Sequence, residues 1–280
     1  MIVWQDKEND TKIDALTRLV PKKQFDLLTL DHLCREYDGT FSRAEIEPGF
    51  KPDRHFRSFF LFYEGKRLMG ELFIFPVPDE NGQIKAEITA IVDPQRRRNG
   101  IFTRLLEAAE EDLEKYGIED YVFVAEPGCE DTDAVRAHKG FNIIRSELIM
   151  ELPRDTEVYS SETIPSDKTE NDGFSVHFDK TAEGFTAILD NMATGESIGK
   201  AHLCLLTDSA FIFGVEIDEG FRNKGLGKAL MKAVIEKART DHPTLKIMLQ
   251  VSSDNVAAVA LYKGLGFAVS SSLDYIDGNP

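Results

Sequence analysis

The chain has 280 residues, 42% of them hydrophobic, and a formal net charge of −16. This hydrophobic fraction is typical of a globular protein, the length favours two domains, and so acidic a composition argues against a nucleic-acid partner, which needs clustered Lys and Arg. The cysteines show no C-x-x-C spacing and no apolar run reaches the roughly 20 residues that cross a bilayer, so we expect a cytoplasmic protein without a metal or a membrane partner.

The first half of the chain alternates strand and helix patterns. Apolar residues at helical spacing predict a helix over 24–37, with Leu27, Leu30, Leu33 and Cys34 on one face. Residues 38–52 show no period and predict a loop or a short helix. The remaining elements are predicted as strands at 56–63, 67–77 and 85–92, a helix after Gly100 that buries Ile101, Leu105, Ala109 and Leu113, a strand at 121–125, a short helix at 132–138 and a strand from 140 to 152.

The second half follows a polar stretch and repeats this order. Residues 153–172 are rich in Ser, Thr, Glu, Asp and Pro, which is typical of a linker. We therefore predict an N-terminal domain at 1–153, a linker at 154–172 and a C-terminal domain at 173–280. In the last of these, strands are predicted at 174–178, 184–189, 197–206 and 210–217, a helix that buries Leu226, Leu230, Val234 and Ala238, a strand at 245–251, a helix at 255–263 and a strand at 267–275.

Spacing supports an internal repeat. Val92 precedes Gly100 by eight residues, and Ile217 precedes Gly225 by the same number. The Gly-Phe pairs at 140–141 and 266–267 follow these glycines by 40 and 41 residues. Agreement over strand, loop, helix, strand and helix predicts two copies of one α/β unit.

The loop at 222–227, Arg-Asn-Lys-Gly-Leu-Gly, lies between an apolar strand and a helix. It is not a P-loop, because Leu226-Gly227 stands where Lys-Ser/Thr should follow, and Leu230 replaces the third glycine of a Rossmann fingerprint. Unpaired N–H groups at a helix start favour a compact anion such as a pyrophosphate, and the glycines let the backbone approach it. Arg222, Lys224 and Lys228 add positive charge, although an ordinary turn with solvated basic residues is the alternative.

Further motifs follow this loop in the order Asn255, Ala258, Leu261-Tyr262 and Gly266-Phe267. Together with the loop they resemble the GNAT superfamily of acyl-CoA-dependent N-acetyltransferases, over residues 184–276 and, in part, 57–150. The resemblance implies two α/β (α+β) domains in tandem, each with a mixed, mostly antiparallel central sheet flanked by helices. It also implies acetyl-CoA as co-substrate, held in the C-terminal domain by Val215, Ile217, Arg222, Asn223, Lys224, Gly225, Leu226, Gly227, Lys228 and Asn255.

Two residues are candidates for catalysis. Tyr262 matches the family's catalytic tyrosine, and a hydroxyl there can protonate a departing thiolate, whereas the competing interpretation is a tyrosine that caps the core. Glu216 lies between apolar residues on the strand and can relay a proton from the incoming amine, or it is a solvated strand end. The resemblance further implies that the strand at 215–217 parts from its neighbour, so that the pantetheine arm pairs with it and a backbone N–H polarises the thioester carbonyl.

The first half departs from the motif. Phe102 stands at the second glycine position, Arg136 corresponds to Tyr262 and Cys129 corresponds to Asn255. Coenzyme binding there stays open, because Gly100 and nearby arginines remain, but transfer by the usual tyrosine is not expected. We predict an N-acetyltransferase that moves an acetyl group directly to a primary amine of a small molecule or peptide, as a monomer or homodimer. The alternative is a non-catalytic coenzyme-A-binding regulatory module.

Overall fold

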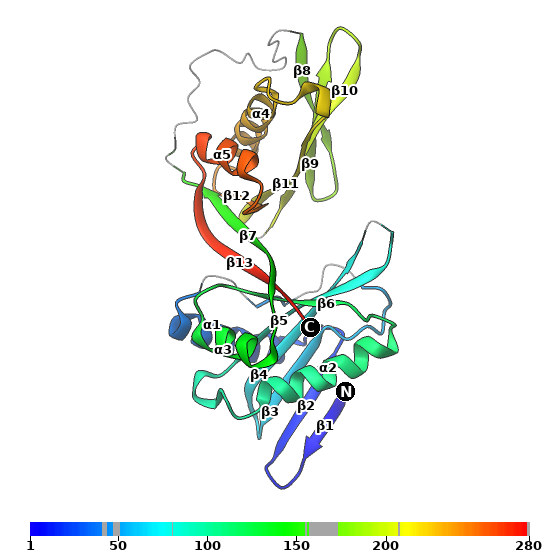
Figure 1. The fold of residues 1–280 in the computed structure, drawn as a ribbon, viewed down its shortest axis with the longest axis vertical. Helices are drawn as coiled ribbons and strands as arrows, with labels where there is room; N and C mark the ends of the chain where they lie inside the picture. The colour runs from blue at the N-terminus through cyan, green and yellow to red at the C-terminus, as the bar shows by residue number, and fades with distance from the viewer. Residues whose placement is uncertain are drawn as a thin grey trace. The chain divides into compact units, whose positions relative to one another are not determined.

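The computed structural model describes residues 1–40, 44–46, 51–79, 81–154, 156, 173–206 and 208–278. The chain forms two compact units, of which unit 1 comprises Met1–Ser146 and Leu273–Pro280 and unit 2 comprises Glu147–Ser272 (Figure 1). Unit 2 is one continuous segment, whereas unit 1 combines the first 146 residues with the C-terminal segment that starts at Leu273. No helix in the described ranges is both long and apolar enough to cross a membrane.

Unit 1 is a mixed sheet with an apolar core on each face. Phe59, Leu61 and Tyr63 of one strand face helix α1, while Phe60 and Phe62 face helix α2, because successive side chains of a strand alternate. The antiparallel strands are β1 (Ile2–Asp6), β2 (Thr11–Leu16), β3 (Phe59–Glu64), β4 (Arg67–Pro78) and β5 (Ile84–Val92), and β6 (Tyr121–Ala125) pairs in parallel with β5. The helices are α1 (Pro21–Asp38), α2 (Ile101–Lys115) and α3 (Glu130–Lys139), with a 3₁₀ turn η1 (Pro94–Arg96).

Unit 2 repeats the strand order of β2 to β6, and its described residues form one apolar core. Leu230, Val234 and Ala238 of helix α4 pack on the sheet face that carries Leu189, Leu203 and Ile212. The antiparallel strands are β8 (Phe174–Lys180), β9 (Gly184–Asn191), β10 (Glu196–Leu205) and β11 (Ser209–Ile217), and β12 (Lys246–Ser252) pairs in parallel with β11. The helices are α4 (Leu226–Asp241) and α5 (Val256–Gly264), with a 3₁₀ turn η2 (Glu219–Phe221).

The last strand of each half of the sequence pairs with a strand of the other half. Residues 147–152 of β7 (Ile143–Leu152) pair antiparallel with β12, and Met150 is buried in the core of unit 2. Residues 274–277 of β13 (Ala268–Asp277) pair antiparallel with β6, and Ile276 is buried in the core of unit 1. Each unit therefore depends on a strand that comes from the other half of the sequence.

The mixed, mostly antiparallel fold with flanking helices is confirmed, and the strands and helices expected from 56 onward lie within a few residues of their predicted positions. The stripes beginning at Ile101 and Leu226 are buried as expected. Leu33 was wrongly assigned to the inner face of α1, since its side chain is 40% exposed. Most of the region at 38–52 and of the predicted linker at 154–172 lies outside the described residues.

Core substitutions in β13 and β7 test which unit each of these strands stabilises. We expect Ile276→Ala to destabilise unit 1 by about 2–5 kcal/mol, the usual cost of truncating a buried Ile, although residue 276 lies at the far end of the chain. Hydrogen exchange followed by mass spectrometry should show lost protection in β5 and β6. The matched variant Met150→Ala should instead lower protection in β9 to β12, and the opposite pattern would contradict the assignment.

Candidate active site

The site is organised by two strands of unit 2 that part. β11 and β12 pair only from Ser209 and Lys246 to Ile212 and Leu249, although β11 continues to Ile217. Among the described residues, none pairs with the edge of 213–217 where β12 would otherwise lie, as the family resemblance implied. Such an edge can accept an extended ligand as an added strand.

A bulge accompanies this parting. Between two paired positions, Lys200 with Glu216 and His202 with Phe213, β11 contains one residue more than β10. Gly214 lies in the extra segment with φ +58°, a conformation that favours glycine, and a bulge bends the strand that carries it. The strand prediction passed over Gly214, although an isolated glycine within a strand pattern is a known signal for a bulge.

The loop after β11 presents unpaired donors. None of the N–H groups of residues 223–227 finds an acceptor among the described residues. Asn223 and Gly225 adopt positive φ values, 61° and 78°, and Gly225 is the N-cap of α4. Free N–H groups at a helix N-terminus attract a compact anion.

The two loop glycines serve different needs. Gly225 is required by its positive φ. Gly227 has an ordinary conformation, and a Cβ there would lie 3.6 Å from Leu261 Cδ2 and 3.7 Å from Ile217 Cγ1, which are ordinary contacts. Neither strain nor packing demands a glycine at 227, so its lack of a side chain leaves room at the helix start for an approaching ligand.

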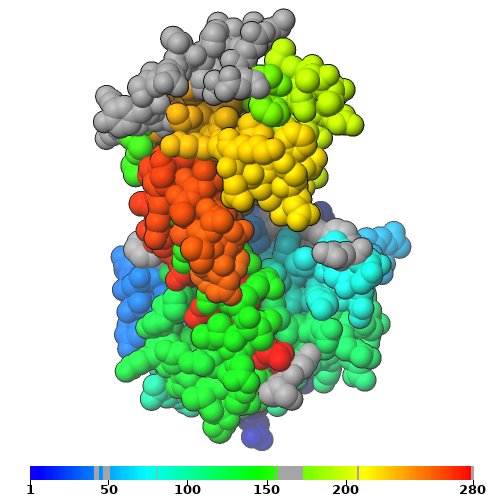
Figure 2. All heavy atoms as spheres, turned by 45° about the horizontal axis from the view of Figure 1, so that its top comes forward, coloured from blue at the N-terminus to red at the C-terminus, as the bar shows by residue number. Residues whose placement is uncertain are grey.

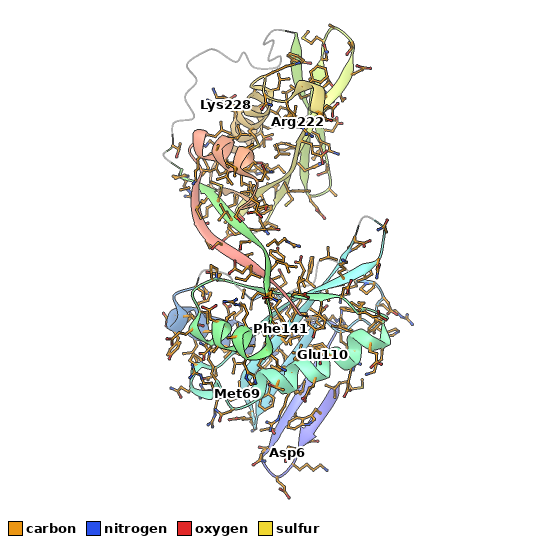
Figure 3. All side chains as sticks on the ribbon, in the orientation of Figure 1. Asp6, Met69, Glu110, Phe141, Arg222 and Lys228 are labelled. Atoms are coloured by element: carbon orange, nitrogen blue, oxygen red, sulfur yellow. The ribbon has the colours of Figure 1, made fainter. Side chains whose placement is uncertain are left out.

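The basic residues of the loop differ in whether their side chains form hydrogen bonds within the protein. Arg222 Nε donates to the Ile217 carbonyl at 2.8 Å, and Lys224 Nζ donates to the Gly220 carbonyl at 2.9 Å. Lys228, on the first turn of α4, is exposed and pairs with no described residue (Figure 3). Leu226 is buried and contributes only its backbone. Lys228 and the outer nitrogens of Arg222 are thus the cations available to an anion.

Helix α5 borders the same region, since Leu261 lies beside Gly227 and Ile217. In Figure 2 the orange atoms of α5 lie next to the yellow atoms around β11 and its loop. Tyr262 is only 7% exposed and packs on Phe267. Its hydroxyl has no hydrogen-bond partner among the described residues, and burial raises its pKa. Asn255 Oδ1 accepts from Ala258 N at 3.1 Å and so caps α5.

The residues expected on β11 are found on both faces of the strand. Val215 and Ile217 pack partly against the core of unit 2. Glu216 is exposed and forms a 3.3 Å ion pair with Lys200. An exposed pair of this kind contributes little energy.

Unit 1 has the same loop backbone with a different charge arrangement. Arg98 and Gly100 have φ values of 62° and 74°, which match Asn223 and Gly225. Arg97 Nε donates to the Val92 carbonyl, as Arg222 does to that of Ile217. The repeat predicted from spacing therefore holds at the level of single residues.

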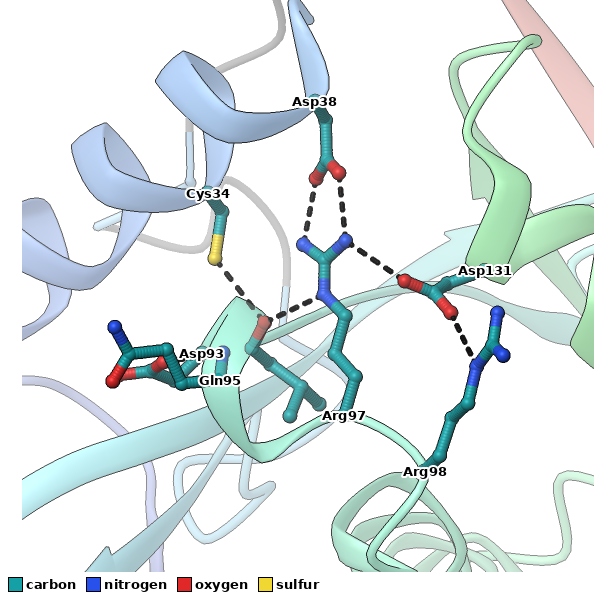
Figure 4. A network of polar contacts seen from close by, with 8 residues as sticks. Cys34, Asp38, Asp93, Gln95, Arg97, Arg98 and Asp131 are labelled. Carbon is teal, nitrogen blue, oxygen red and sulfur yellow. Dashed lines mark hydrogen bonds and ion pairs between the residues drawn. The ribbon is translucent and has the colours of Figure 1, made fainter.

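Carboxylates clamp the arginines of this first loop (Figure 4). Arg97 donates to both oxygens of Asp38 at 2.6 and 2.7 Å and to Asp131 at 3.1 Å, and Arg98 donates to Asp131 at 3.1 Å. Burial opposes ionisation of Asp131, but the hydrogen bonds from the two arginines outweigh it and lower its pKa. The positive charge that an anion needs is therefore neutralised within unit 1.

The other positions aligned from the sequence also correspond. Phe141 N donates to the Arg136 carbonyl, as Phe267 N donates to that of Tyr262. Cys129 and Asn255 are both helix N-caps, but only Asn255 uses its side chain. Phe102, which replaces the second glycine, packs on Phe123 of β6. Unit 1 thus keeps the framework but has Arg136 in place of the tyrosine and Phe102 in place of the second glycine.

Known proteins share this sequence pattern. A model described as the acetyltransferase (GNAT) family matches residues 27–142 and 147–267. The [ribosomal protein bS18]-alanine N-acetyltransferase of Salmonella typhimurium is 35% identical over 63 residues, which cover 22% of this chain and 42% of that protein. The spermine/spermidine N(1)-acetyltransferase of Bacillus subtilis is 36% identical over 59 residues, which cover 21% and 39%. The matches span about two fifths of the length of these relatives.

Solved structures share the fold over nearly the whole chain. A GCN5-related N-acetyltransferase from Sphaerobacter thermophilus aligns with a TM-score of 0.74 at 14% identity and covers 96% of this chain and 95% of its own. A tandem GNAT protein from the clavulanic acid biosynthesis pathway aligns with a TM-score of 0.70 at 17% identity, covering 96% and 99%.

The two helix N-caps make a matched stability test. Asn255→Ala removes the side-chain acceptor for Ala258 N, and we expect it to lower the free energy of unfolding by about 1 kcal/mol. Cys129→Ala removes no capping bond and should change stability by less than about 0.5 kcal/mol. Denaturant unfolding of both variants measures the difference. Equal effects would show that the Asn255 cap adds nothing.

Proposed function

The chain belongs to the acetyltransferase (GNAT) family, and from this premise we propose that unit 2 transfers an acetyl group from acetyl-CoA to a primary amine of a small molecule or peptide. The observation that carries the proposal is the free backbone edge at residues 213–217, which leads directly into a loop with unpaired N–H groups. An extended arm that ends in a pyrophosphate matches both features in order.

The residues of unit 2 suit this coenzyme. The N–H groups of 223–227 would hold the pyrophosphate, with Lys228 and the outer nitrogens of Arg222 as counter-charges and Lys224 beside them. The edge at Val215 to Ile217 would pair with the amides of the pantetheine arm, and Asn255 lies at the start of the neighbouring helix. Gly227 leaves the approach open. Acetyl-CoA supplies an acetyl group activated as a thioester.

Groups of unit 2 would stabilise the charge that develops during transfer and protonate the leaving group. A backbone N–H on the free edge of β11 would stabilise the negative charge that develops on the carbonyl oxygen when the amine attacks. As the carbon–nitrogen bond forms and the carbon–sulfur bond breaks, Tyr262 would give its proton to the departing thiolate sulfur. Burial raises the pKa of Tyr262, so the phenol carries its proton at neutral pH and the donor form is present.

Direct transfer is favoured over a cysteine-bound acetyl group. Burial raises the pKa of Cys34 to about 12 and also raises the pKa of Cys204. Neither thiol is set up as a nucleophile, since the thiolate is the reactive form. The amine would therefore attack the thioester itself.

We propose that unit 1 does not bind the coenzyme. Asp38 and Asp131 occupy the arginines of its loop, and Phe102 stands where unit 2 has Gly227. A pyrophosphate there would have to displace carboxylates from Arg97 and would meet their negative charge. One coenzyme per chain follows.

Calorimetric titration with coenzyme A tests this arrangement. We expect a stoichiometry near one, and Gly227→Phe, which copies the residue of the first loop, should weaken binding at least about tenfold, or roughly 1.4 kcal/mol. The matched change Phe102→Leu keeps the contact with Phe123 and should leave the affinity unchanged. A stoichiometry near two, or undiminished binding by Gly227→Phe, would refute the assignment to unit 2.

Tyr262→Phe tests the acid. We expect kcat to fall roughly 10- to 1000-fold with coenzyme affinity nearly unchanged, because one proton donor is lost and no binding contact is removed. Thiol release from acetyl-CoA, measured with a polyamine, an amino sugar and a peptide with a free N-terminus, reports the rate. Arg136→Ala changes the corresponding residue of unit 1 and should have no effect.

Unchanged kcat for Tyr262→Phe, under conditions where chemistry limits the rate, would assign this residue to packing. Absence of thiol release from the unmodified protein with every class of amine would favour the alternative function, a coenzyme-A-binding module without catalysis.

A further inference from the structure

A row of three side chains crosses the sheet of unit 2 beside the bulge. Thr186 of β9, His202 of β10 and Phe213 of β11 are direct cross-strand partners. Ala201 and Leu203, the neighbours of His202 along β10, are buried in the core under α4. Because side chains of a strand alternate, His202 lies on the sheet face that α4 and α5 do not cover.

The imidazole of His202 is held in place but keeps one nitrogen free. Its Nδ1 lies 2.9 Å from the Thr186 hydroxyl, and its ring stacks on Phe213 with centroids 5.2 Å apart. Its Nε2 has no partner among the described residues. When the Thr186 oxygen accepts from Nδ1–H, the free Nε2 lone pair is a proton acceptor.

His202 is also fitted to the bulge. A Cβ at Gly214 would lie 2.8 Å from His202 Cδ2 and 3.5 Å from Nε2, so the ring occupies the space that a side chain would need. The residue opposite the bulge is therefore in contact with the point where β11 leaves β12.

We propose that His202 is the general base of unit 2, taking a proton from the acceptor ammonium at Nε2. This assignment rests on the function proposed above. With the pyrophosphate at residues 223–227, the arm would run back along β11 toward Phe213, which brings its reactive end to the bulge and to His202. The ammonium loses one proton to Nε2, and the freed lone pair forms the carbon–nitrogen bond as the carbon–sulfur bond breaks. The nitrogen then loses its second proton to water, and the Tyr262 phenolate regains from water the proton that it gave to sulfur. The imidazolium then returns the proton to water.

The proposal separates the acid from the base. Tyr262 belongs to the core under α4 and α5, whereas His202 lies on the opposite face of the sheet. The amine would lose its proton on one face, and the thiolate would gain one on the other. A single residue then need not serve both steps.

Other ionisable groups near this face are less suitable. On β10, Lys200 is paired with Glu216, and burial raises the pKa of Cys204. On β9, Asp190 lies 2.6 Å from His177. Glu216, the base suggested by the sequence, is exposed and engaged with a lysine, so His202 is the better placed acceptor.

Paired variants test the assignment. We expect His202→Gln to lower kcat/KM at neutral pH by roughly 100-fold, the usual worth of a general base, while calorimetry shows coenzyme affinity unchanged. Below the pKa of the amine, the residual rate should rise about tenfold per pH unit, because the variant depends on amine already deprotonated in solution. Imidazole should restore activity to His202→Ala. His177→Gln, which changes a histidine on β8 of the same unit, should be nearly as active as the unmodified protein.

Full activity of His202→Gln would overturn the proposal, as would failure of imidazole to rescue a folded His202→Ala. Nitrogen NMR of the coenzyme-free protein gives a test that needs no turnover. We expect neutral His202 to carry its proton on Nδ1, and a proton on Nε2 would refute the role. Absence of thiol release by the unmodified protein with every class of amine would instead refute the proposed function.

Discussion

The parting of β11 from β12 is the constraint on which the site depends. A continuous parallel pair would satisfy the backbone groups of residues 213–217 internally and leave nothing for a ligand. The bulge at Gly214 bends β11 where this pairing has ended, and His202 fills the space beside that glycine. Strand edge, anion loop and candidate base are thus consequences of one break in a ladder of hydrogen bonds.

The two units show how one backbone supports different electrostatics. Their loops share positive φ values at equivalent positions and the same arginine-to-carbonyl bond. In unit 1 the arginine continues to Asp38 and Asp131, which hold its charge within the unit. In unit 2 the corresponding guanidinium keeps its outer nitrogens exposed. Among the described residues, the two loops therefore differ in the carboxylates that α1 and α3 bring to the arginines of unit 1.

Local patterns in the sequence predicted most of the elements and the repeat, because period and glycine position act over a few residues. The strands β1 and β2 were not predicted, and Leu33 was assigned to the wrong side of α1. The loop and Tyr262 could be named from motifs. His202 could not, since its importance follows from its cross-strand partners Thr186 and Phe213 and from a bulge, none of which is visible as a spacing.

The exchange of β7 and β13 has a consequence for how the chain is made. The edge of β6 is covered by residues 274–277, which are synthesised about 150 residues after β6 itself. Unit 1 therefore cannot complete its sheet until residue 277 has been made, and its pairing closes a loop of about 150 residues, which slows folding. During translation the exposed β6 edge is open to wrong partners.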